Sequence, residues 1–450
     1  MNRANLNTDL KNSAEFLKRA ISNEKRIAVI SHLDADGITS ASIMFNLLKG
    51  LGANFQLRLI KQAEKKIIKT ISEINADLFI FLDMGSGQKE ILSQYIEKDI
   101  LILDHHHPEG NATGKTIEIN IDNYGFNGST ESSASTLCYL FSKFAGSDFG
   151  EIQALVGALG DQQEMVGLNK EVLDIAIKKN IITIHKDLNL FGRQTKPVFQ
   201  ALCYSDLDLP KTTWEVQQIF QDIIDIDKVK DKTYAELPIE IHKKMISKII
   251  EYKLSCGKNN FDNFLTDFYF FNEAIDGSEM KSLREFAVVL NSCGRQKETA
   301  IGILFAENPK KYYNQVSTIY KIYKQNLAKL INWFDSKESN AFIENKGVLT
   351  IIKPNNVLKP DVVGVVSSIY FKLKNSEIII GAAYDEELEL LKISCRSKKQ
   401  KINNTLKTAA KFVGGSGGGH DLAGGAYIAQ DKFEDFCKVF EEEIKKEAKP

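Results

Sequence analysis

The chain has 450 residues, of which 43% are hydrophobic and 26% charged, and its formal net charge is −1. This length exceeds what one hydrophobic core usually organises, so we expect two or three domains. The balanced charge argues against a strongly basic nucleic-acid-binding protein, so any contact with nucleic acid must come from local patches.

The six cysteines form no CxxC pair, which argues against a disulfide framework and a thiolate zinc site and fits a reducing cytoplasm. The N-terminus is polar and carries no signal-peptide pattern. No apolar run approaches the roughly 20 residues of a membrane helix. We therefore expect a cytoplasmic protein.

The N-terminal part of the chain alternates short apolar runs with helix-like segments. The runs at 26–31, 76–82 and 99–103 are apolar on both faces, which is typical of buried strands in a parallel sheet. Residues 39–49 have the pattern of a helix that ends at Gly50 and Gly52. This alternation predicts a doubly wound α/β domain over residues 1–203.

The composition changes between residues 204 and 345, where long, charged, helix-favouring segments predict a mostly helical insert. Short apolar strands return from residue 346, and a Gly-rich stretch at 414–425 precedes a charged terminal helix. We expect a smaller α/β domain over residues 346–450, in which residues 414–425 form a loop.

Acidic residues follow directly after the three predicted strands. The first strand leads into His32-Leu33-Asp34-Ala35-Asp36-Gly37, the second into Asp83, and the third into Asp104-His105-His106-His107, while an apolar run at 155–160 delivers Asp161. The carboxyl ends of parallel strands form the ligand crevice of an open sheet, so these side chains are expected to converge. Carboxylates packed together repel each other, and a pair of divalent cations relieves that repulsion.

A single Asp after a strand is usually a turn or helix N-cap residue, but four such segments together favour a metal site. The mixture of Asp and His donors without thiolate suits Mn²⁺ or Mg²⁺, and is compatible with Co²⁺ or Zn²⁺. Two such ions would clamp the attacking and leaving oxygens of a phosphoryl displacement.

The motifs HLDADG (32–37), LDMG (82–85), LDHHHP (103–108) and GALGD (157–161) resemble, in the expected order, those of the DHH phosphoesterase superfamily. The stretches ISCRS (393–397) and GGSGGGHDLAGG (414–425) resemble the C-terminal substrate-binding domain of that family, the DHHA1 domain. The resemblance implies a DHH catalytic domain, a DHHA1 domain and a substrate cleft between them.

The resemblance also implies roles for individual residues. One metal ion would be held by Asp34 and Asp83, with His32 as a further ligand. The second would be held by Asp36, Asp83, His105 and Asp161, so that Asp83 bridges the two ions and a metal-bridging hydroxide attacks. The catalytic residues would be Asp83, Asp104 and His106, with His106 contacting the scissile phosphate or assisting the leaving group. Mn²⁺ is the expected ion.

Several stretches resemble the archaeal RecJ-like branch of the family: the H-x-D-x-D spacing of the first motif, residues 120–132, LFGRQTKP (190–197) and NSCGR (291–295). The implied substrate-binding residues are Asn120, Ser129, Arg193, Arg295, Arg396, Ser397, Gly417, Gly418, Gly419 and His420. For Arg193 and Arg295, a surface charge or a structural ion pair is an equally weighted alternative.

These observations predict a metal-dependent exonuclease that hydrolyses phosphodiester bonds of single-stranded DNA or RNA in replication or repair. By resemblance, a GINS-like replisome protein is an expected partner. One alternative is a phosphodiesterase for oligoribonucleotides, pAp or cyclic dinucleotides, against which the first-motif spacing and the long insert argue. Another is a replisome scaffold with weak activity, against which the complete ligand set argues. Cleavage polarity and the choice between DNA and RNA stay open.

Overall fold

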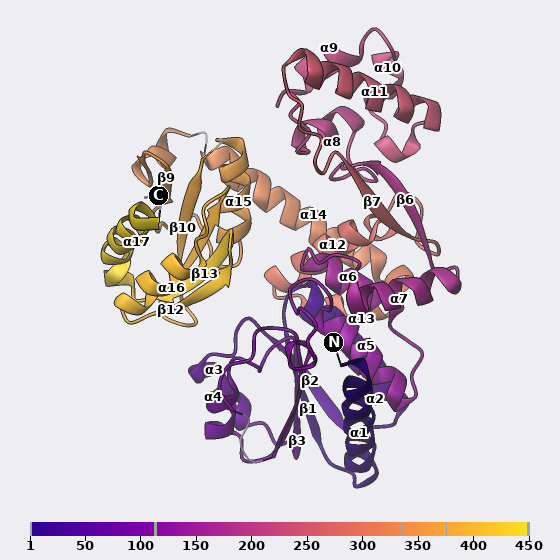
Figure 1. The fold of residues 1–450 in the computed structure, drawn as a ribbon, viewed down its shortest axis with the longest axis vertical. Coiled ribbons are helices and arrows are strands. Elements are labelled where there is room, and N and C mark those ends of the chain that lie inside the picture. The colour runs from indigo at the N-terminus through magenta and orange to yellow at the C-terminus, as the bar shows by residue number, and fades with distance from the viewer. Residues whose placement is uncertain (1, 112–114, 335, 375, 448–450) are drawn as a thin grey trace. The chain divides into compact units, whose positions relative to one another are not determined.

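The computed structural model describes residues 2–111, 115–334, 336–374 and 376–447. The chain divides into two compact units, one that ends at Thr318 and one that begins at Ile319 (Figure 1). Both units are built of helices and sheets, and the first carries a five-stranded parallel sheet, which confirms the predicted α/β class. The domain boundaries at residues 203 and 345 stay predictions.

The sheet of the first unit has the strand order β2-β1-β3-β4-β5, and every neighbouring pair is parallel. Its strands are β1 (Ile27–His32), β2 (Phe55–Ile60), β3 (Leu78–Leu82), β4 (Asp99–Asp104) and β5 (Thr116–Asn120). The register pairs Ser31 with Leu82 and Leu82 with Leu103. The carboxyl ends of the three central strands are therefore level with one another.

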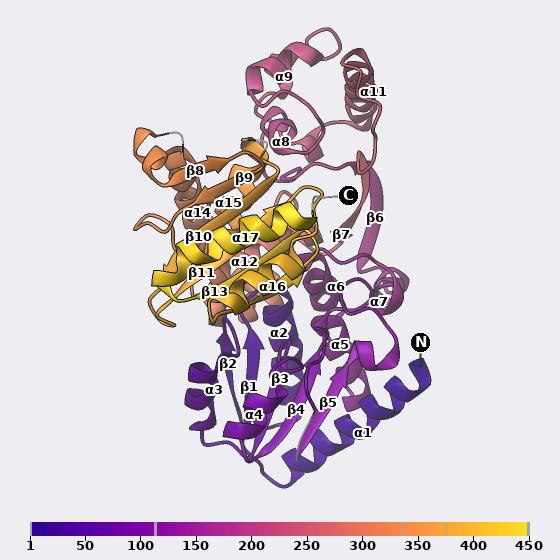
Figure 2. The same cartoon turned by 60° about the vertical axis from the view of Figure 1, so that its left-hand side comes forward.

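Helices cover both faces of this sheet, as Figures 1 and 2 show. On one face lie α3 (Lys65–Ser72) and α4 (Lys89–Tyr95), whose Ile68, Ile71 and Leu92 pack on Phe79 and Phe81. On the other lie α1 (Arg3–Ser22), α2 (Ala35–Gly50) and α5 (Ala134–Ala145). Burial from both sides explains why the strands are apolar throughout.

Four more helices pack against α2 and α5 or against each other: α6 (Glu151–Gly160), α7 (Gly167–Lys178), α12 (Leu283–Arg295) and α13 (Thr299–Glu307). Between α7 and α12 the chain runs out and back along an antiparallel ribbon of β6 (Ile182–Leu188) and β7 (Leu265–Phe271) (Figure 1). The ribbon leads to residues 189–264, here called the helical lobe. The lobe contains α8 (Val198–Tyr204), α9 (Thr213–Phe220), α10 (Ile226–Val229) and α11 (Ile239–Ser255), around a core of its own.

The boundary between the units falls within α14 (Pro309–Phe334), so the second unit begins with the later part of this helix. Its six-stranded sheet has the order β12-β13-β11-β10-β9-β8. The strands are β8 (Ile343–Lys346), β9 (Leu349–Ile352), β10 (Ile378–Asp385), β11 (Leu390–Ser397), β12 (Ser416–His420) and β13 (Ala423–Ile428). One face packs on α15 (Val363–Leu373), and the other on α16 (Asn403–Phe412) and α17 (Phe433–Glu447).

The Gly-rich stretch at 414–425 is not the loop expected from the sequence but largely the hairpin of β12 and β13. The glycines are needed because α16 and the partner strand lie very close. A Cβ atom on Gly424 would lie 2.6 Å from Leu406 Cδ2 and 2.8 Å from the Gly418 carbonyl oxygen. Glycine here therefore reflects close packing within a strand.

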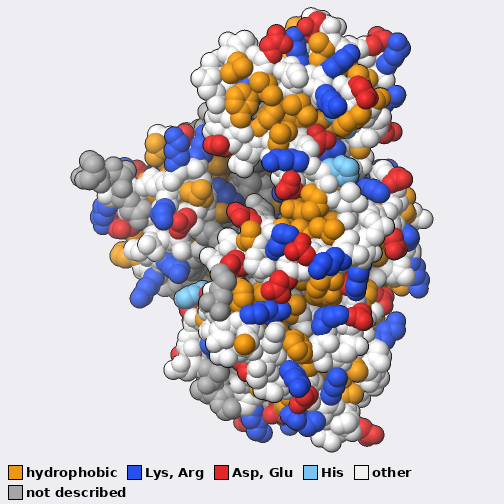
Figure 3. Space-filling view, turned by 45° about the vertical axis from the view of Figure 1, so that its right-hand side comes forward, with side chains coloured by type: hydrophobic (Ala, Val, Ile, Leu, Met, Phe, Trp, Pro, Cys, Tyr) orange, Lys and Arg blue, Asp and Glu red, His pale blue; other side chains and the backbone are white. Residues whose placement is uncertain are grey.

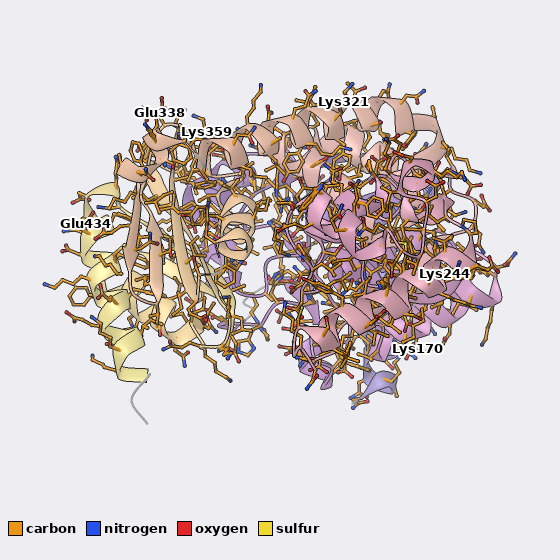
Figure 4. The ribbon with its side chains drawn as sticks, turned by 90° about the horizontal axis from the view of Figure 1, so that it is seen from above. Lys170, Lys244, Lys321, Glu338, Lys359 and Glu434 are labelled. Carbon is orange, nitrogen blue, oxygen red and sulfur yellow. The ribbon has the colours of Figure 1, made fainter. Side chains whose placement is uncertain are left out.

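Acidic and basic side chains are interspersed over the face drawn in Figure 3, in keeping with the net charge of −1. Lys170 of α7 and Lys244 of α11 are exposed and point into solvent (Figure 4). None of the helices in the described part of the chain has the length and apolar character that a bilayer crossing requires.

Candidate metal centre

The first predicted motif forms the turn from β1 into α2. Asp34 is the N-cap of α2, and its side chain accepts a hydrogen bond of 3.0 Å from the Gly37 backbone nitrogen. Asp36 lies in the first helical turn and is fully buried. Position 37 must be glycine, because a Cβ atom there would lie 2.1 Å from the His32 carbonyl oxygen. The tight turn thus brings His32, Asp34 and Asp36 to one edge of the sheet.

Asp83 follows the end of β3, in the middle of the sheet, with a left-handed backbone (φ 58°). Such a conformation is uncommon outside glycine and often occurs at functional sites. Asp83 is 2% exposed, and neither of its carboxylate oxygens has a hydrogen-bond partner within the described part of the chain. A buried carboxylate without partners is costly unless a cation compensates it.

Two groups of side chains meet at Asp83. His32 Nδ1 lies 2.9 Å from Asp34 Oδ2 and 3.4 Å from Asp83 Oδ2. His105 Nε2 lies 3.2 Å from Asp83 Oδ1, 3.3 Å from Asp161 Oδ2 and 3.8 Å from Asp36 Oδ2. In each group the donor atoms lie within 4.8 Å of one another.

The structure thus brings all six predicted ligands together, in the two sets that the resemblance implied, with Asp83 common to both. His106 lies close enough to Asp83 and His105 to form a third grouping. The fourth motif contributes differently from the first three, because Asp161 is the C-cap of helix α6 and does not end a strand. The role of the six residues as metal ligands stays a prediction.

His105 presents its ring in the orientation that a metal ligand needs. Its Nδ1 lies 2.6 Å from the Gly128 carbonyl oxygen, which can only accept, so Nδ1 carries the hydrogen. Its Nε2 then offers a lone pair to the cluster, and this buried atom has no hydrogen-bond partner among the described residues. A carbonyl behind the ring of a ligating histidine is the usual arrangement in metal sites. The donor set therefore fits divalent cations.

The electrostatics of the cluster point the same way. Burial disfavours charge on His32 and His105, but the facing carboxylates outweigh it and hold the pKa of both imidazoles well above the usual range. Burial and the neighbouring carboxylates of Asp83 and Asp161 raise the pKa of Asp36 well above its usual value. Without cations, protons on these side chains thus offset the negative charge of the cluster. Bound divalent cations would replace these protons.

Asp104 belongs to neither ligand group and instead orients His106. Its carboxylate accepts hydrogen bonds from the backbone nitrogens of Ser86 (2.9 Å), His105 (2.8 Å) and His106 (3.1 Å). It also accepts one of 2.8 Å from His106 Nδ1. Desolvation opposes charge on His106, but Asp104 raises the pKa of this histidine to about 9. The side chain of His106 is 58% exposed, so a substrate can reach its ring.

The predicted substrate residues of the first unit lie in different environments. Asn120 is buried, and its amide donates to Ser86 Oγ (2.8 Å) and to the His106 carbonyl (2.7 Å), which braces the loops around His106. Ser129 is exposed, next to Gly128. Arg193 is 5% exposed and donates to Asp187 Oδ2 at 2.9 Å, a geometry that favours the structural ion pair. Arg295 is half-buried at the end of α12.

The other predicted substrate residues lie in the second unit. Arg396 of β11 donates from Nε to Ser368 Oγ (3.1 Å) and from Nη1 to the Cys395 carbonyl (2.8 Å). Ser397 is buried beside it, and Gly417, Gly418 and Gly419 lie in β12. His420 ends β12, and its side chain lies outside the described residues. Substrate contact by these residues, and the cleft that was expected between the domains, stay predictions.

Two residues of NSCGR support the first motif in a way that sequence reasoning missed. Asn291 Oδ1 accepts a hydrogen bond of 2.9 Å from the Ala35 backbone nitrogen. A Cβ atom on Gly294 would lie 1.7 Å from the Leu33 carbonyl oxygen, so only glycine lets α12 approach the turn this closely. The NSCGR match was the available signal, but it directed attention to Arg295.

Comparisons with known proteins agree with this architecture. Residues 26–177 match the DHH family, N-terminal domain, and residues 346–446 match the DHHA1 domain. The chain is 28% identical over 431 residues to an uncharacterized protein of Methanocaldococcus jannaschii, covering 93% of each chain. It is 28% identical over 107 residues to the single-stranded-DNA-specific exonuclease RecJ of Bacillus subtilis, covering 22% of this chain and 14% of that protein.

Two solved structures share the fold. RecJ of Thermus thermophilus in complex with Mn²⁺ aligns with a TM-score of 0.59 at 15% identity, covering 97% of this chain and 55% of that one. CDC45 of Entamoeba histolytica aligns with a TM-score of 0.66 at 12% identity, covering 98% of this chain and 99% of that one.

Proposed function

We propose that this chain, which belongs to the DHH phosphoesterase superfamily and carries both a DHH and a DHHA1 domain, is a RecJ-like, metal-dependent exonuclease for single-stranded DNA or RNA. The observation that carries the proposal is Asp83, a buried carboxylate that has no hydrogen-bond partner among the described residues and that two groups of Asp and His donors share. The name of the Bacillus relative, a single-stranded-DNA-specific exonuclease, supports the substrate class.

Six residues would hold two divalent cations. His32, Asp34 and Asp83 form one donor set, and Asp36, Asp83, His105 and Asp161 the other. Manganese is the ion we propose, supported by the Asp and His donor types and by the Mn²⁺ and Mg²⁺ complexes of Thermus RecJ. When bound, such ions lower the pKa of water and neutralise charge on a phosphodiester.

The remaining residues would position and protonate the substrate. Asp104 accepts a hydrogen bond from His106 Nδ1 and raises the pKa of this histidine to about 9, so at neutral pH the ring also carries a hydrogen on Nε2. From there His106 would donate a hydrogen bond to a phosphate oxygen or a proton to the leaving oxygen. Asn120 holds the His106 carbonyl and so limits movement of this loop. A GINS-like partner and a role in replication or repair stay predictions from the sequence.

Digestion of oligonucleotides tests the proposal directly. Single-stranded DNA and RNA, labelled at either end, would be incubated with the full chain and Mn²⁺, with and without EDTA. We expect progressive shortening that EDTA and Asp83→Asn abolish, and the label released first gives the polarity. Shortening that survives Asp83→Asn would contradict the proposal. Turnover of cyclic dinucleotides or pAp alone would favour the small-substrate phosphodiesterase, and no turnover at all would favour the scaffold.

Adjacent histidines provide a matched pair of variants. His106 is held by Asp104, whereas His107 is exposed and lies 3.4 Å from Asp122 Oδ2. His106→Asn should lower kcat by about 10²–10⁴-fold, the usual contribution of a positioned acid, with KM little changed. His107→Asn should leave both constants near wild type. Equal effects of the two substitutions would exclude the role proposed for His106.

A further inference from the structure

Buried amide side chains lie directly behind His105. Gln163 is 5% exposed and its Nε2 donates to the carbonyl oxygens of Gly128 (2.8 Å) and Ser132 (3.2 Å). The Gly128 oxygen is also the acceptor for His105 Nδ1, at 2.6 Å. Gln163 therefore fixes the carbonyl that selects the tautomer of His105.

The network continues from Gln163 to Asn169, which is fully buried. Gln163 Oε1 accepts from Asn169 Nδ2 at 2.8 Å, and Asn169 Oδ1 accepts from Thr136 Oγ1 at 2.7 Å. The oxygen of each amide faces donors and its nitrogen faces carbonyl or amide oxygens, while Gln163 Nε2 also lies 3.2 Å from His105 Nδ1. Both amides thus have one satisfied orientation, and turning either would place like partners against each other.

The far end of the network is the N-terminus of α5, which holds Asp36. The backbone nitrogens of Ala134 and Ser135 donate to the two carboxylate oxygens of Asp36 at 2.7 and 3.0 Å. Thr136 is the next residue of the same turn. The network therefore connects His105 to Asp36, and Gln163 itself lies two residues after Asp161. His105, Asp36 and Asp161 all belong to the second donor group.

We infer that Gln163 and Asn169 are positioning residues for this second group, which hold His105 with Nε2 open to a cation and fix its distance from Asp36. The inference rests on the proposed two-cation chemistry. Neither residue touches the donor atoms of the cluster. They act through the Gly128 carbonyl on one side and through the first turn of α5 on the other.

A matched pair of glutamine variants tests the inference. Gln153 on α6 is 6% exposed and donates from Nε2 to the Ala306 carbonyl at 2.6 Å, outside the network. Gln163→Leu and Gln153→Leu thus remove equally buried amides by the same substitution. The readout is Mn²⁺ binding to the full chain, measured by calorimetric titration and by electron paramagnetic resonance.

Gln163→Leu should weaken one of the two Mn²⁺ sites by about 10–100-fold, the usual effect of removing a partner of a metal ligand, and leave the other near wild type. Gln153→Leu should leave both sites near wild type. The inference is overturned if Gln163→Leu binds both ions with wild-type affinity, or if Gln153→Leu weakens binding equally. If the wild-type chain binds no Mn²⁺, the proposed function itself fails.

Thr136→Val decides the question if Gln163→Leu does not fold. This change removes one hydroxyl and keeps the shape of the side chain, so it disturbs packing less than Gln163→Leu does. It should weaken the same Mn²⁺ site several-fold, whereas wild-type affinity in this variant would overturn the inference.

Discussion

The metal centre and the base of the helical lobe both bury aspartate beside histidine, but the two carboxylates are treated differently. Asp187, at the base of the lobe, accepts from the Leu188 nitrogen (2.8 Å) and Tyr234 hydroxyl (2.9 Å) on Oδ1 and from Arg193 (2.9 Å) on Oδ2. Asp83 has no such partner on either oxygen within the described residues. Asp187 therefore has hydrogen-bond partners on both of its oxygens within the protein. For Asp83, we propose that cations take the place of such partners.

The pKa values of the histidines in the two clusters are shifted in opposite directions. Burial lowers the pKa of His242, which stacks on Tyr234 and donates from Nε2 to the Tyr234 carbonyl oxygen at 2.7 Å. Burial would also lower the pKa of His105, but the carboxylates that face its Nε2 outweigh burial and raise this pKa well above its usual value. The comparison teaches that buried charge alone does not identify a site. What distinguishes the candidate metal centre is that both oxygens of its central carboxylate, Asp83, lack hydrogen-bond partners among the described residues.

The largest effect is expected for Asp83→Asn. Nuclease activity should fall by about three orders of magnitude or more, because the ions contribute several kcal/mol of charge stabilisation. The free energy of unfolding without metal should change little, because asparagine keeps the shape of the side chain and His32 and His105, whose pKa values this carboxylate raises, can release their protons. Urea denaturation with EDTA measures this. A clearly destabilised Asp83→Asn protein would contradict the comparison.

Asp187→Ala should lower stability and leave the metal affinity unchanged. It leaves the buried Arg193 guanidinium among Tyr234, Phe268 and Phe270 without a counter-ion, which should lower the free energy of unfolding by about 3–5 kcal/mol. Mn²⁺ affinity of the folded fraction should not change. The exposed Asp148, paired with Lys143, serves as control, and Asp148→Ala should leave the free energy of unfolding near wild type. Loss of Mn²⁺ binding in folded Asp187→Ala would erase the distinction between the clusters.

Glu285 of α12, which accepts hydrogen bonds from the two residues after Arg193, gives a smaller, pH-dependent effect. Burial raises the pKa of Glu285 to about 7. Hydrogen bonds from the Gln194 nitrogen and the Thr195 hydroxyl oppose this shift only in part. Because the unfolded chain releases this proton near pH 4.5, stability should fall as the pH rises from about 4.5 to 7, by up to about 3 kcal/mol. Glu285→Gln should flatten that part of the profile. An unchanged slope in denaturation midpoints over this range would count against it.

Asn291→Ala is expected to have the smallest effect. It leaves the Ala35 nitrogen, at the start of α2, without its side-chain acceptor, which should cost about 1 kcal/mol of stability. The turn that carries Asp34 and Asp36 should loosen, so Mn²⁺ affinity should fall a few-fold. Titration with Mn²⁺ measures this, and unchanged affinity would mean that α12 only packs on the turn.

The strands and the clustering of the Asp and His side chains could be predicted because local sequence determines both. Residues 26–31, 76–82 and 99–103 are apolar on both faces, and Asp34, Asp83 and Asp104 follow them directly, so a parallel sheet must bring these residues to one edge. The DHH-type order of motifs then assigned Asp161, although it caps a helix.

Long-range packing could not be predicted in this way. The hydrogen bond from Ala35 to Asn291 spans 256 positions, and the link from Gln163 to the Gly128 carbonyl depends on how two loops meet. The hairpin at 416–428 was missed because glycine has low strand propensity, and only the packing of α16 against Gly424 explains its use there.

Counting bound Mn²⁺ in the wild-type chain and in Asp83→Asn tests the central claim most directly, since Asp83 joins both donor groups. Equilibrium titration followed by electron paramagnetic resonance gives number and affinity together. The account predicts two ions per wild-type chain, in neighbouring sites, and the loss of both in Asp83→Asn. Wild-type stoichiometry and affinity in Asp83→Asn, or no binding to the wild-type chain, would contradict it.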